Sequence, residues 1–192
     1  MIAVIEGCGT NLASIVFALE RLGQNVQVTS NAQHLQAASH VIIPGVSTAQ
    51  RAMAQLKQQN LVETLRSLTQ PVLGICSGMQ ILFDWCEEGA VNGLGIFTGK
   101  VIKLSANVLP HMGWNTLQLQ TDCRLFAHIS DNSYVYFVHS YGTEVNAQTI
   151  ASCNYGNHFS AMVAKENYYG FQFHPERSGK VGLQLLRNFI EL

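Results

Sequence analysis

The chain has 192 residues, of which 47% are hydrophobic and 12% are charged, and its formal net charge is −1. This length and apolar content suit a single domain, residues 1–192, with a substantial core. The near-neutral charge argues against a nucleic-acid or membrane-surface partner, and no apolar run approaches the roughly 20 residues that span a bilayer. Five cysteines without a repeated spacing, and a start that lacks a signal peptide, favour a reducing cytoplasm.

The first half of the chain alternates short apolar runs with stretches of helical spacing. The expected strands are 2–5, 26–28, 41–43 and 72–75. A helix is predicted between the first two strands, with Asn11 as its N-cap and Gly23 as its stop. The segment 47–68 is predicted to form two helices that break near 59–60. Strand, helix and strand in this order indicate parallel pairing in a doubly wound α/β sheet.

The pattern changes after Gly89, where glycines separate short segments rich in β-forming residues. The expected strands are 95–104, 116–119, 134–138, 149–152 and 168–173. The connections between them are too short for helices, so we expect antiparallel strands or hairpins. A last amphipathic helix is predicted over 181–190. The predicted fold class is therefore α/β: an open mixed, largely parallel sheet flanked by helices, with added antiparallel strands in the second half.

Cys76 lies between Gly74 and Gly78, directly after the predicted strand 72–75. Glycines at these two positions let backbone pass close to backbone. The residue between them can then hold a strained conformation with its side chain thrust outward. Residues 79–83 have helical spacing, and a thiol at a helix N-terminus is favoured as thiolate. The stretch predicts a nucleophile, although a buried core cysteine after a strand fits it equally well.

A cysteine nucleophile needs a base, and that base needs an orienting carboxylate. His174 ends a predicted strand, and Pro175 separates it from Glu176, so both side chains can project the same way; an exposed turn is the alternative. His111 and His139 receive no role from the sequence. The other histidines lie in polar segments and are expected at the surface: His34, His40, His128 and His158. No cluster of histidine, cysteine and carboxylate residues has ligand spacing, so no metal is expected.

Pro44, Gly45 and Val46 follow the third predicted strand. A proline and a glycine at this position fix a turn and expose backbone amides at the sheet edge where α/β proteins bind ligands. A plain strand-to-helix turn is the alternative.

Three sequence blocks together resemble the class I (triad) glutamine amidotransferases. They are PGV at 44–46, GICSGMQ at 74–80 and FQFHPE at 171–176. The resemblance covers essentially the whole chain and implies the flavodoxin-like architecture of that family. Further blocks are similar to one branch of the family, whose members supply ammonia to a (β/α)8-barrel cyclase. These blocks are GTNL at 9–12, PHMGWN at 110–115 and YFVHSY at 136–141.

The resemblance implies a chemistry for the residues singled out above. Cys76 would attack the carboxamide carbon of glutamine, His174 would protonate the departing ammonia, and Glu176 would orient His174. The glutamyl thioester would then be hydrolysed to glutamate. Backbone N–H groups are implied to hold the oxyanion, and other positions to contact glutamine or the partner. The oxyanion positions are Ser77, Gly45 and Val46; the glutamine positions are Gln80, Ser140 and Tyr141; the partner positions are Asn11, Trp114, Tyr136 and Arg177.

The partner implied by the resemblance is a cyclase (synthase) subunit, a (β/α)8 barrel, in a heterodimer. It would use the ammonia to make imidazole glycerol phosphate and AICAR from PRFAR in histidine biosynthesis, and no cofactor is implied. Three alternatives are a glutaminase subunit of another pathway, a catalytically silent regulatory subunit, and a cysteine hydrolase acting on γ-glutamyl peptides. The other pathways considered are sugar modification and the synthesis of pyridoxal phosphate or anthranilate.

Two segments depart from the family pattern. Glu6-Gly7-Cys8 stands where an acid, an aromatic residue and a glycine are usual, so the first loop is expected to have an altered shape. Ser47 replaces the glycine after PGV. Because that turn is expected to rearrange when glutaminase activity is switched on, Ser47 is expected to affect the oxyanion geometry and its regulation.

Overall fold

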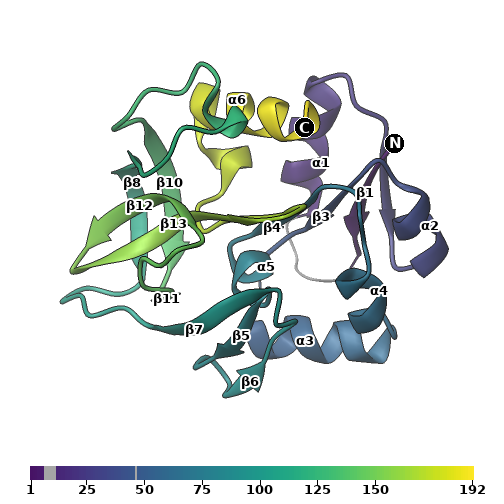
Figure 1. The fold of residues 1–192 in the computed structure, drawn as a ribbon, viewed down its shortest axis with the longest axis horizontal. Helices are drawn as coiled ribbons and strands as arrows, with labels where there is room; N and C mark the ends of the chain where they lie inside the picture. The colour runs from purple at the N-terminus through teal and green to yellow at the C-terminus, as the bar shows by residue number, and fades with distance from the viewer. Residues whose placement is uncertain (7–11, 46) are drawn as a thin grey trace.

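A computed structural model of the chain describes residues 1–6, 12–45 and 47–192 (Figure 1). An eight-stranded sheet forms its centre, and its parallel part consists of β1 (Ile2–Ile5), β2 (Val26–Thr29), β3 (His40–Ile43), β4 (Val72–Ile75) and β14 (Tyr168–Phe171). Antiparallel strands extend it: β13 (Asn157–Lys165), β12 (Thr149–Tyr155) and β9 (Gln118–Leu119). The order across the sheet is β2-β1-β3-β4-β14-β13-β12-β9. The predicted mixed, largely parallel sheet is confirmed.

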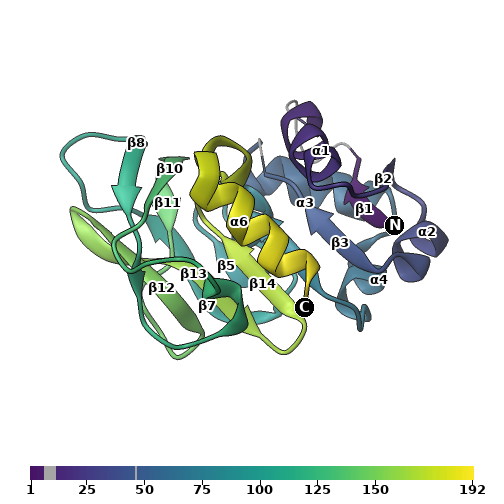
Figure 2. The same ribbon diagram turned by 90° about the horizontal axis from the view of Figure 1, so that it is seen from above.

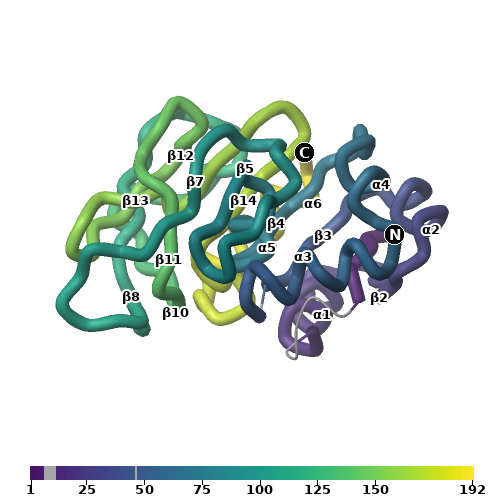
Figure 3. The backbone as a smooth tube through the Cα atoms, turned by 90° about the horizontal axis from the view of Figure 1, so that it is seen from below, coloured from purple at the N-terminus to yellow at the C-terminus, as the bar shows by residue number. Residues whose placement is uncertain are grey.

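Helices cover both faces of the parallel strands. One face carries α1 (Leu12–Arg21) and α6 (Gly179–Ile190), seen in front in Figure 2. The opposite face carries α2 (Ala32–Ala37), α3 (Ala49–Gln58) and α4 (Val62–Arg66), as Figure 3 shows. Alternate residues of β1 point to opposite faces of the sheet, so Val4 belongs to the core on one face and Ile5 to the separate core on the other. Strands buried on both faces have continuous apolar sequences, which explains why the sequence predicts them well.

Two small sheets lie beside the large one. β8 (His111–Thr116) pairs antiparallel with β10 (Tyr134–His139). A four-stranded sheet has the order β11-β7-β5-β6, with β5 (Phe83–Cys86), β6 (Val91–Asn92), β7 (Phe97–Lys103) and β11 (Tyr141–Gly142). Two 3₁₀-helices, η1 (Arg124–Phe126) and η2 (Pro175–Arg177), lie in the connections before β10 and α6.

The helix expected after Cys76 is much shorter than its sequence pattern predicts. α5 (Ser77–Gln80) is a single turn, and β5 begins at Phe83. The N–H of Leu94 donates to the carbonyl of Ile81 at 2.6 Å, and the N–H of Ile96 donates to that of Leu82 at 2.9 Å. These tertiary hydrogen bonds override the helical spacing of the apolar residues.

Other local expectations also differ from the structure. α2, β8 and β13 occupy segments for which the sequence predicts no element; α2 begins at a cap in which the Asn31 side chain accepts from the N–H of Gln33 at 2.8 Å. The last strand was expected among antiparallel hairpins, but β14 pairs in parallel with β4 as well as antiparallel with β13. His40, expected at the surface, is half-buried, with its ring 5.3 Å from that of Phe189.

Candidate active site

Cys76 occupies the sharp turn between β4 and α5. Its φ of 52° and ψ of −114° are a strained conformation for a residue with a side chain. The N–H of Cys76 donates to the carbonyl of Phe171 on β14 at 2.7 Å, so the neighbouring strand holds the turn in place. The residue is 9% exposed. This is the geometry that the sequence predicts for a nucleophile, although α5 is too short to contribute much of a helix dipole.

Two glycines allow this turn to pack against the end of β3. A Cβ on Gly78 would collide with the carbonyl of Ile43. A Cβ on Gly45 would collide with the carbonyl of Ile75 and with the backbone nitrogen of Ser77. Gly45 and Ser77, two of the predicted oxyanion positions, therefore lie backbone against backbone.

His174 and Glu176 follow β14, and the pair spans the start of η2. Nδ1 of His174 lies 2.8 Å from Oε1 of Glu176, and the two side chains are 6% and 5% exposed. Because an ionised carboxylate only accepts, Nδ1 carries the proton of this hydrogen bond. In the parallel pair of β14 and β4, Phe171 stands opposite Ile75. His174 and Cys76 therefore follow adjacent strands at the same edge of the sheet.

The pKa of His174 reflects this pairing. Burial lowers the pKa, but hydrogen bonds and charge interactions with Cys76 and Glu176 outweigh burial and raise it to about 10. The imidazole is therefore protonated at neutral pH. Since Nδ1 bonds Glu176, Nε2 is the nitrogen available to Cys76. An imidazolium beside a cysteine favours the thiolate, so the three side chains can act as nucleophile, proton donor and orienting carboxylate.

Buried amides connect the Cys76 sulfur to the predicted glutamine-binding residues. Nε2 of Gln172 lies 3.7 Å from the sulfur, and the carbonyl oxygen of Val138 lies 3.8 Å from it. Oε1 of Gln172 accepts from Nε2 of Gln80 at 3.1 Å, and the same amide of Gln80 donates to the carbonyl of Tyr141 at 2.9 Å. Gln80 and Tyr141 are thus joined to each other and, through Gln172, to Cys76.

The other predicted oxyanion and substrate positions have simpler surroundings. Ser140 lies between β10 and β11, and its carbonyl accepts from the N–H of Leu104 at 3.0 Å. Ser77 is buried, and its hydroxyl has no hydrogen-bond partner among the described residues. Val46 lies outside the described residues, as does Asn11, which was predicted to cap the first helix and to face the partner.

Only one of the two departures from the family pattern can be followed in the structure. Ser47 is half-buried, and its hydroxyl donates to the carbonyl of Thr48 at 3.3 Å. The Thr48 side chain caps α3 by accepting from the N–H of Arg51 at 3.2 Å. The effect of Ser47 on regulation stays a prediction. Gly7 and Cys8 of the first loop lie outside the described residues.

Three of the predicted partner positions form one cluster, in which Arg177 is exposed and Tyr136 is half-buried. Trp114 on β8 is 54% exposed, and its ring meets that of Tyr136 on β10 edge-on, with 5.9 Å between centroids. The guanidinium of Arg177 lies 5.3 Å from the centroid of the Tyr136 ring. The carbonyl of Tyr136 accepts from the N–H of His174 at 2.9 Å. This aromatic cluster of Trp114, Tyr136 and Arg177 therefore adjoins the backbone of the candidate proton donor.

Comparison with known proteins places the fold and site in a family. The family model described as glutamine amidotransferase class-I matches residues 4–192. The chain belongs to the class-I glutamine amidotransferases. The predicted family is confirmed, and the described residues of the three sequence blocks that indicate it come together at one edge of the sheet, where Gly45 packs against the Cys76 turn and His174 follows the neighbouring strand.

Named relatives of this amidotransferase are similar over its whole length. A Pasteurella multocida protein named imidazole glycerol phosphate synthase subunit HisH is 50% identical, over 99% of this chain and 97% of the relative. A Haemophilus influenzae protein with the same name is 48% identical, over 99% of this chain and 96% of the relative. The solved structure of PurLQS from Thermotoga maritima has a TM-score of 0.78 at 18% identity, covering 99% and 97% of the two chains. That last likeness shows the fold alone.

The amidotransferase site includes residues to which the sequence assigns no role. Gln172 is fully buried between two phenylalanines in the FQFHPE block, and a polar residue inside such an apolar run is the signal that could have found it. His111 and His139 are 3% and 6% exposed and stand opposite each other in the register of β8 and β10. No local pattern reveals that pairing.

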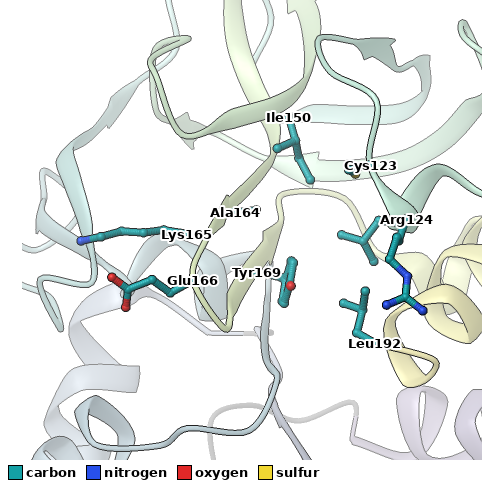
Figure 4. A pocket seen from close by; sticks show the side chains of 9 residues that line it. Cys123, Arg124, Ile150, Ala164, Lys165, Glu166, Tyr169 and Leu192 are labelled. Carbon is teal, nitrogen blue, oxygen red and sulfur yellow. The ribbon is translucent and has the colours of Figure 1, made fainter.

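A cavity of about 300 Å³ lies at another place in the amidotransferase (Figure 4). Its lining includes Cys123, Arg124, Ile150, Tyr169 and Leu192. None of the residues that line it is a predicted site residue. This cavity is therefore separate from the candidate active site.

The described residues supply neither a reactive thiol at Cys86 or Cys153 nor a metal site. Burial raises the pKa of the Cys86 and Cys153 thiols to about 12, so neither is a ready nucleophile. No group of three or more potential metal ligands occurs within 1–6, 12–45 and 47–192. In that same part of the amidotransferase, every helix is too short or too polar to cross a membrane.

Proposed function

We propose that this chain is a glutaminase subunit that hydrolyses L-glutamine to glutamate and ammonia and passes the ammonia to a synthase subunit. The observation that carries the proposal is the pairing of His174 with Glu176 at 2.8 Å, beside Cys76 on its strained turn. Family membership supports the reaction. The relatives named as HisH subunits favour imidazole glycerol phosphate synthase as the complex.

The reaction begins with attack by the Cys76 thiolate on the carboxamide carbon of glutamine. The carbonyl electrons move to oxygen and give a tetrahedral oxyanion. His174, protonated because its pKa is about 10, donates its Nε2 proton to the amide nitrogen; the C–N bond then breaks and ammonia leaves. Neutral His174 takes a proton from water, whose oxygen attacks the thioester. The C–S bond breaks, which releases glutamate and returns the thiolate.

Backbone amides stabilise the oxyanion in this proposal. The N–H of Ser77 is the first donor, because it directly follows the nucleophile, as in other strand-to-helix nucleophile turns. The second donor comes from the turn at 45–46. The contact of Gly45 with the Ser77 backbone supports this choice, because it brings the two segments together. Gln80, Ser140 and Tyr141 complete the proposed glutamine site, and no cofactor takes part.

The aromatic cluster is the proposed docking surface for the synthase subunit. Trp114 and Arg177 in this cluster are exposed, and the cluster adjoins His174 through the backbone of Tyr136. Aromatic and arginine side chains dominate the binding energy of many interfaces. The proposed partner is a (β/α)8-barrel cyclase in a heterodimer, which conducts ammonia and makes imidazole glycerol phosphate and AICAR from PRFAR. Asn11, which lies outside the described residues, is also a predicted partner position.

The test measures glutamate release by the purified chain, alone and with the cyclase subunit and its nucleotide ligand. We expect weak release alone and a strong increase in the complex. Cys76→Ser should abolish synthesis from glutamine but leave synthesis from added ammonium salts, because that reaction belongs to the cyclase. Cys123→Ser, which changes a cysteine in the separate cavity, is the matched control and should keep both activities.

Different outcomes would reject different parts of the proposal. If the folded complex releases no glutamate, this chain is a catalytically silent regulatory subunit and the enzyme proposal fails. Full glutaminase activity without any partner would reject the assigned pathway but keep the triad. Activation by a synthase of another pathway, and not by the cyclase, would reassign the partner. Glutamine turnover by Cys76→Ser at the wild-type rate would remove the nucleophile assignment.

A further inference from the structure

Two histidines that the proposed mechanism does not use form a buried pair beside the site. Nδ1 of His111 lies 3.3 Å from Nε2 of His139. The ring of His111 stacks on that of Tyr155, with centroids 4.0 Å apart, and on that of Phe137 at 4.8 Å. Both histidines are almost fully buried. A buried imidazole with both nitrogens in hydrogen-bond contact has a defined proton arrangement, and the neighbouring groups determine it here.

One end of this pair is fixed by a carbonyl. Nδ1 of His139 lies 2.8 Å from the carbonyl oxygen of Tyr141. A carbonyl only accepts, so Nδ1 of His139 must donate. In a neutral imidazole the other nitrogen is then an acceptor, so Nε2 of His139 accepts the proton carried by Nδ1 of His111.

The other end is fixed independently by Asn115. The N–H of Thr116 donates to Oδ1 of Asn115 at 2.8 Å, and Nδ2 of Asn115 donates to the carbonyl of Asn154 at 3.0 Å, which fixes the orientation of the amide. Nδ2 also contacts Nε2 of His111 at 3.4 Å, so that nitrogen accepts. His111 must then carry its proton on Nδ1. The two ends taken together therefore require one direction of donation and two neutral imidazoles.

The chain of hydrogen bonds continues from Tyr141 to the nucleophile. The carbonyl of Tyr141 that accepts from His139 also accepts from Gln80 at 2.9 Å. Gln80 donates to Gln172 at 3.1 Å, and Gln172 contacts the Cys76 sulfur at 3.7 Å. Each donor in this series has an acceptor, so the orientation of each amide depends on the one before it.

We infer that His111 and His139 are positioning residues for the glutaminase reaction. As two neutral, Nδ1-protonated imidazoles they hold the carbonyl of Tyr141, and through it Gln80 and Gln172, in the orientation that Cys76 and bound glutamine require. The inference rests on the proposed function for its effect on activity. The predicted proton arrangement is independent of that function.

The surroundings of the two rings agree with the neutral state. Burial lowers the pKa of His111 to about 4, and burial together with the charges of His111 and His174 lowers that of His139 to about 3. The titratable groups that face the pair are His174, the Cys76 thiol beyond Val138, and the Tyr155 phenol stacked on His111. A proton added to either ring would place two donors against each other within the chain.

Two substitutions of His139 separate positioning from packing. Asn places an amide nitrogen where Nδ1 stands, so His139→Asn keeps the hydrogen bond to the Tyr141 carbonyl. Gln is larger and closer to histidine in volume, but its amide lies at the position of Nε2, so His139→Gln loses that hydrogen bond. Each variant is assayed in the complex with the cyclase subunit, with glutamine and, separately, with ammonium salts. The ammonium reaction reports that the complex has formed.

We expect kcat/KM for glutamine to fall about tenfold or more in His139→Gln and by less than about threefold in His139→Asn. The ammonium reaction should be unchanged in both. An equal fall in the two variants, or a larger fall in His139→Asn, would show that packing alone matters and would overturn the inference. The absence of any fall in His139→Gln would do the same.

A measurement on the unsubstituted chain tests the proton arrangement without reference to activity. Nitrogen NMR of the chain labelled in histidine distinguishes the two neutral forms from the imidazolium. We expect His111 and His139 to be neutral, protonated on Nδ1, and unchanged when the pH is lowered from 7 to about 5.5. An Nε2-protonated form, or titration of either ring near 6.5, would contradict the inference even if the glutaminase proposal holds. Conversely, loss of the glutaminase proposal would leave this spectrum as predicted.

Discussion

Oε1 of Glu176 accepts the Nδ1 proton of His174 at 2.8 Å, in a pair whose side chains are both almost fully buried. The carboxylate therefore fixes which nitrogen of the ring faces Cys76, and it stabilises the positive charge on the ring. Orientation and charge are separate contributions. They respond differently to substitution of Glu176 and to pH.

Replacement of the carboxylate by an amide should remove the negative charge that stabilises the imidazolium, while the shape of the side chain and an oxygen that can accept from Nδ1 are kept. In Glu176→Gln we expect glutamine hydrolysis in the complex to fall by about a hundredfold or more, because proton transfer by a positioned group contributes at least that factor. The pKa of His174 should fall from about 10 toward its ordinary value, which NMR titration of the ring would detect. A variant with full activity and an unchanged His174 titration would contradict the role of Glu176.

The raised pKa of His174 predicts the alkaline limb of the pH profile. The imidazolium that is proposed to donate a proton to leaving ammonia persists up to a pH of about 10, so kcat/KM for glutamine should be nearly constant between pH 7.5 and about 9 and should fall above it. The interactions that raise the pKa of His174 also stabilise the folded chain. Because the folded pKa lies above the unfolded 6.5, this stabilisation is complete below pH 6.5 and is lost as the pH rises through about 10. An activity loss centred near pH 7 would contradict the prediction.

The lowered pKa of His139 predicts a loss of stability at acid pH instead of alkaline pH. Its folded pKa of about 3 lies below the unfolded 6.5, so its contribution to stability is present above pH 6.5 and is lost as the pH falls toward 3. Between these two values the contribution of His139 to the free energy of unfolding should decrease by about 1.4 kcal/mol for each unit by which the pH falls. Urea unfolding of the wild type and of His139→Asn, at several pH values from 7 to 4, should show a shallower slope for the variant. Equal slopes would show that His139 does not resist protonation in the folded state.

The packing of Gly78 against Ile43 predicts a severe effect of one methyl group. A Cβ there meets a backbone carbonyl that cannot move without shifting β3, so Gly78→Ala should abolish glutamine hydrolysis and lower the free energy of unfolding by about 2 kcal/mol or more. Gly142→Ala is the control, because its nearest new neighbour is Cδ2 of Leu104 at 3.2 Å, the end of a flexible side chain. Thermal unfolding and glutamate release would compare the two, and equal effects would contradict the prediction.

The exposed Trp114 ring predicts a partner-binding defect without a folding defect. Trp114→Ala should weaken the complex with the cyclase by about tenfold or more, as truncation of an aromatic hot spot does. The stability of the free variant should stay close to that of the wild type, because Trp114 is 54% exposed. Val28→Ala, on the edge strand β2 and 40% exposed, is the control and should bind normally. Titration calorimetry of both variants measures this difference, and equal affinities would remove Trp114 from the interface.

The sequence predicts well those features that depend on local patterns. Val72–Ile75 is a continuous apolar run because β4 is covered on both faces, and Gly74 and Gly78 mark the turn at Cys76 because only backbone fits there. The triad is predicted for a related reason: its residues lie within a few positions of the ends of two such strands. Motif and strand pattern therefore support each other.

The features that the sequence does not reveal depend on long-range pairing. His111 and His139 meet only because β8 and β10 pair in one particular register, which neither strand encodes by itself. β5 replaces the expected helix because residues 94–97 supply hydrogen-bond partners from farther along the chain. Gln172 lies within the FQFHPE block, but its contact with Cys76 joins residues 96 positions apart in the sequence.

The hydrogen bond from Cys76 to Phe171 has a consequence for how the molecule is assembled. During synthesis the nucleophile leaves the ribosome long before β14 does, and until then one edge of β4 is open. β14 takes an interior place in the sheet, between β4 and β13, and the candidate proton donor His174 lies three residues after its end. A nascent chain therefore holds its cysteine without a base. The ability to hydrolyse glutamine therefore arises only when β14 is inserted beside β4. Activity in a nascent or refolding chain would show that the central sheet has been completed.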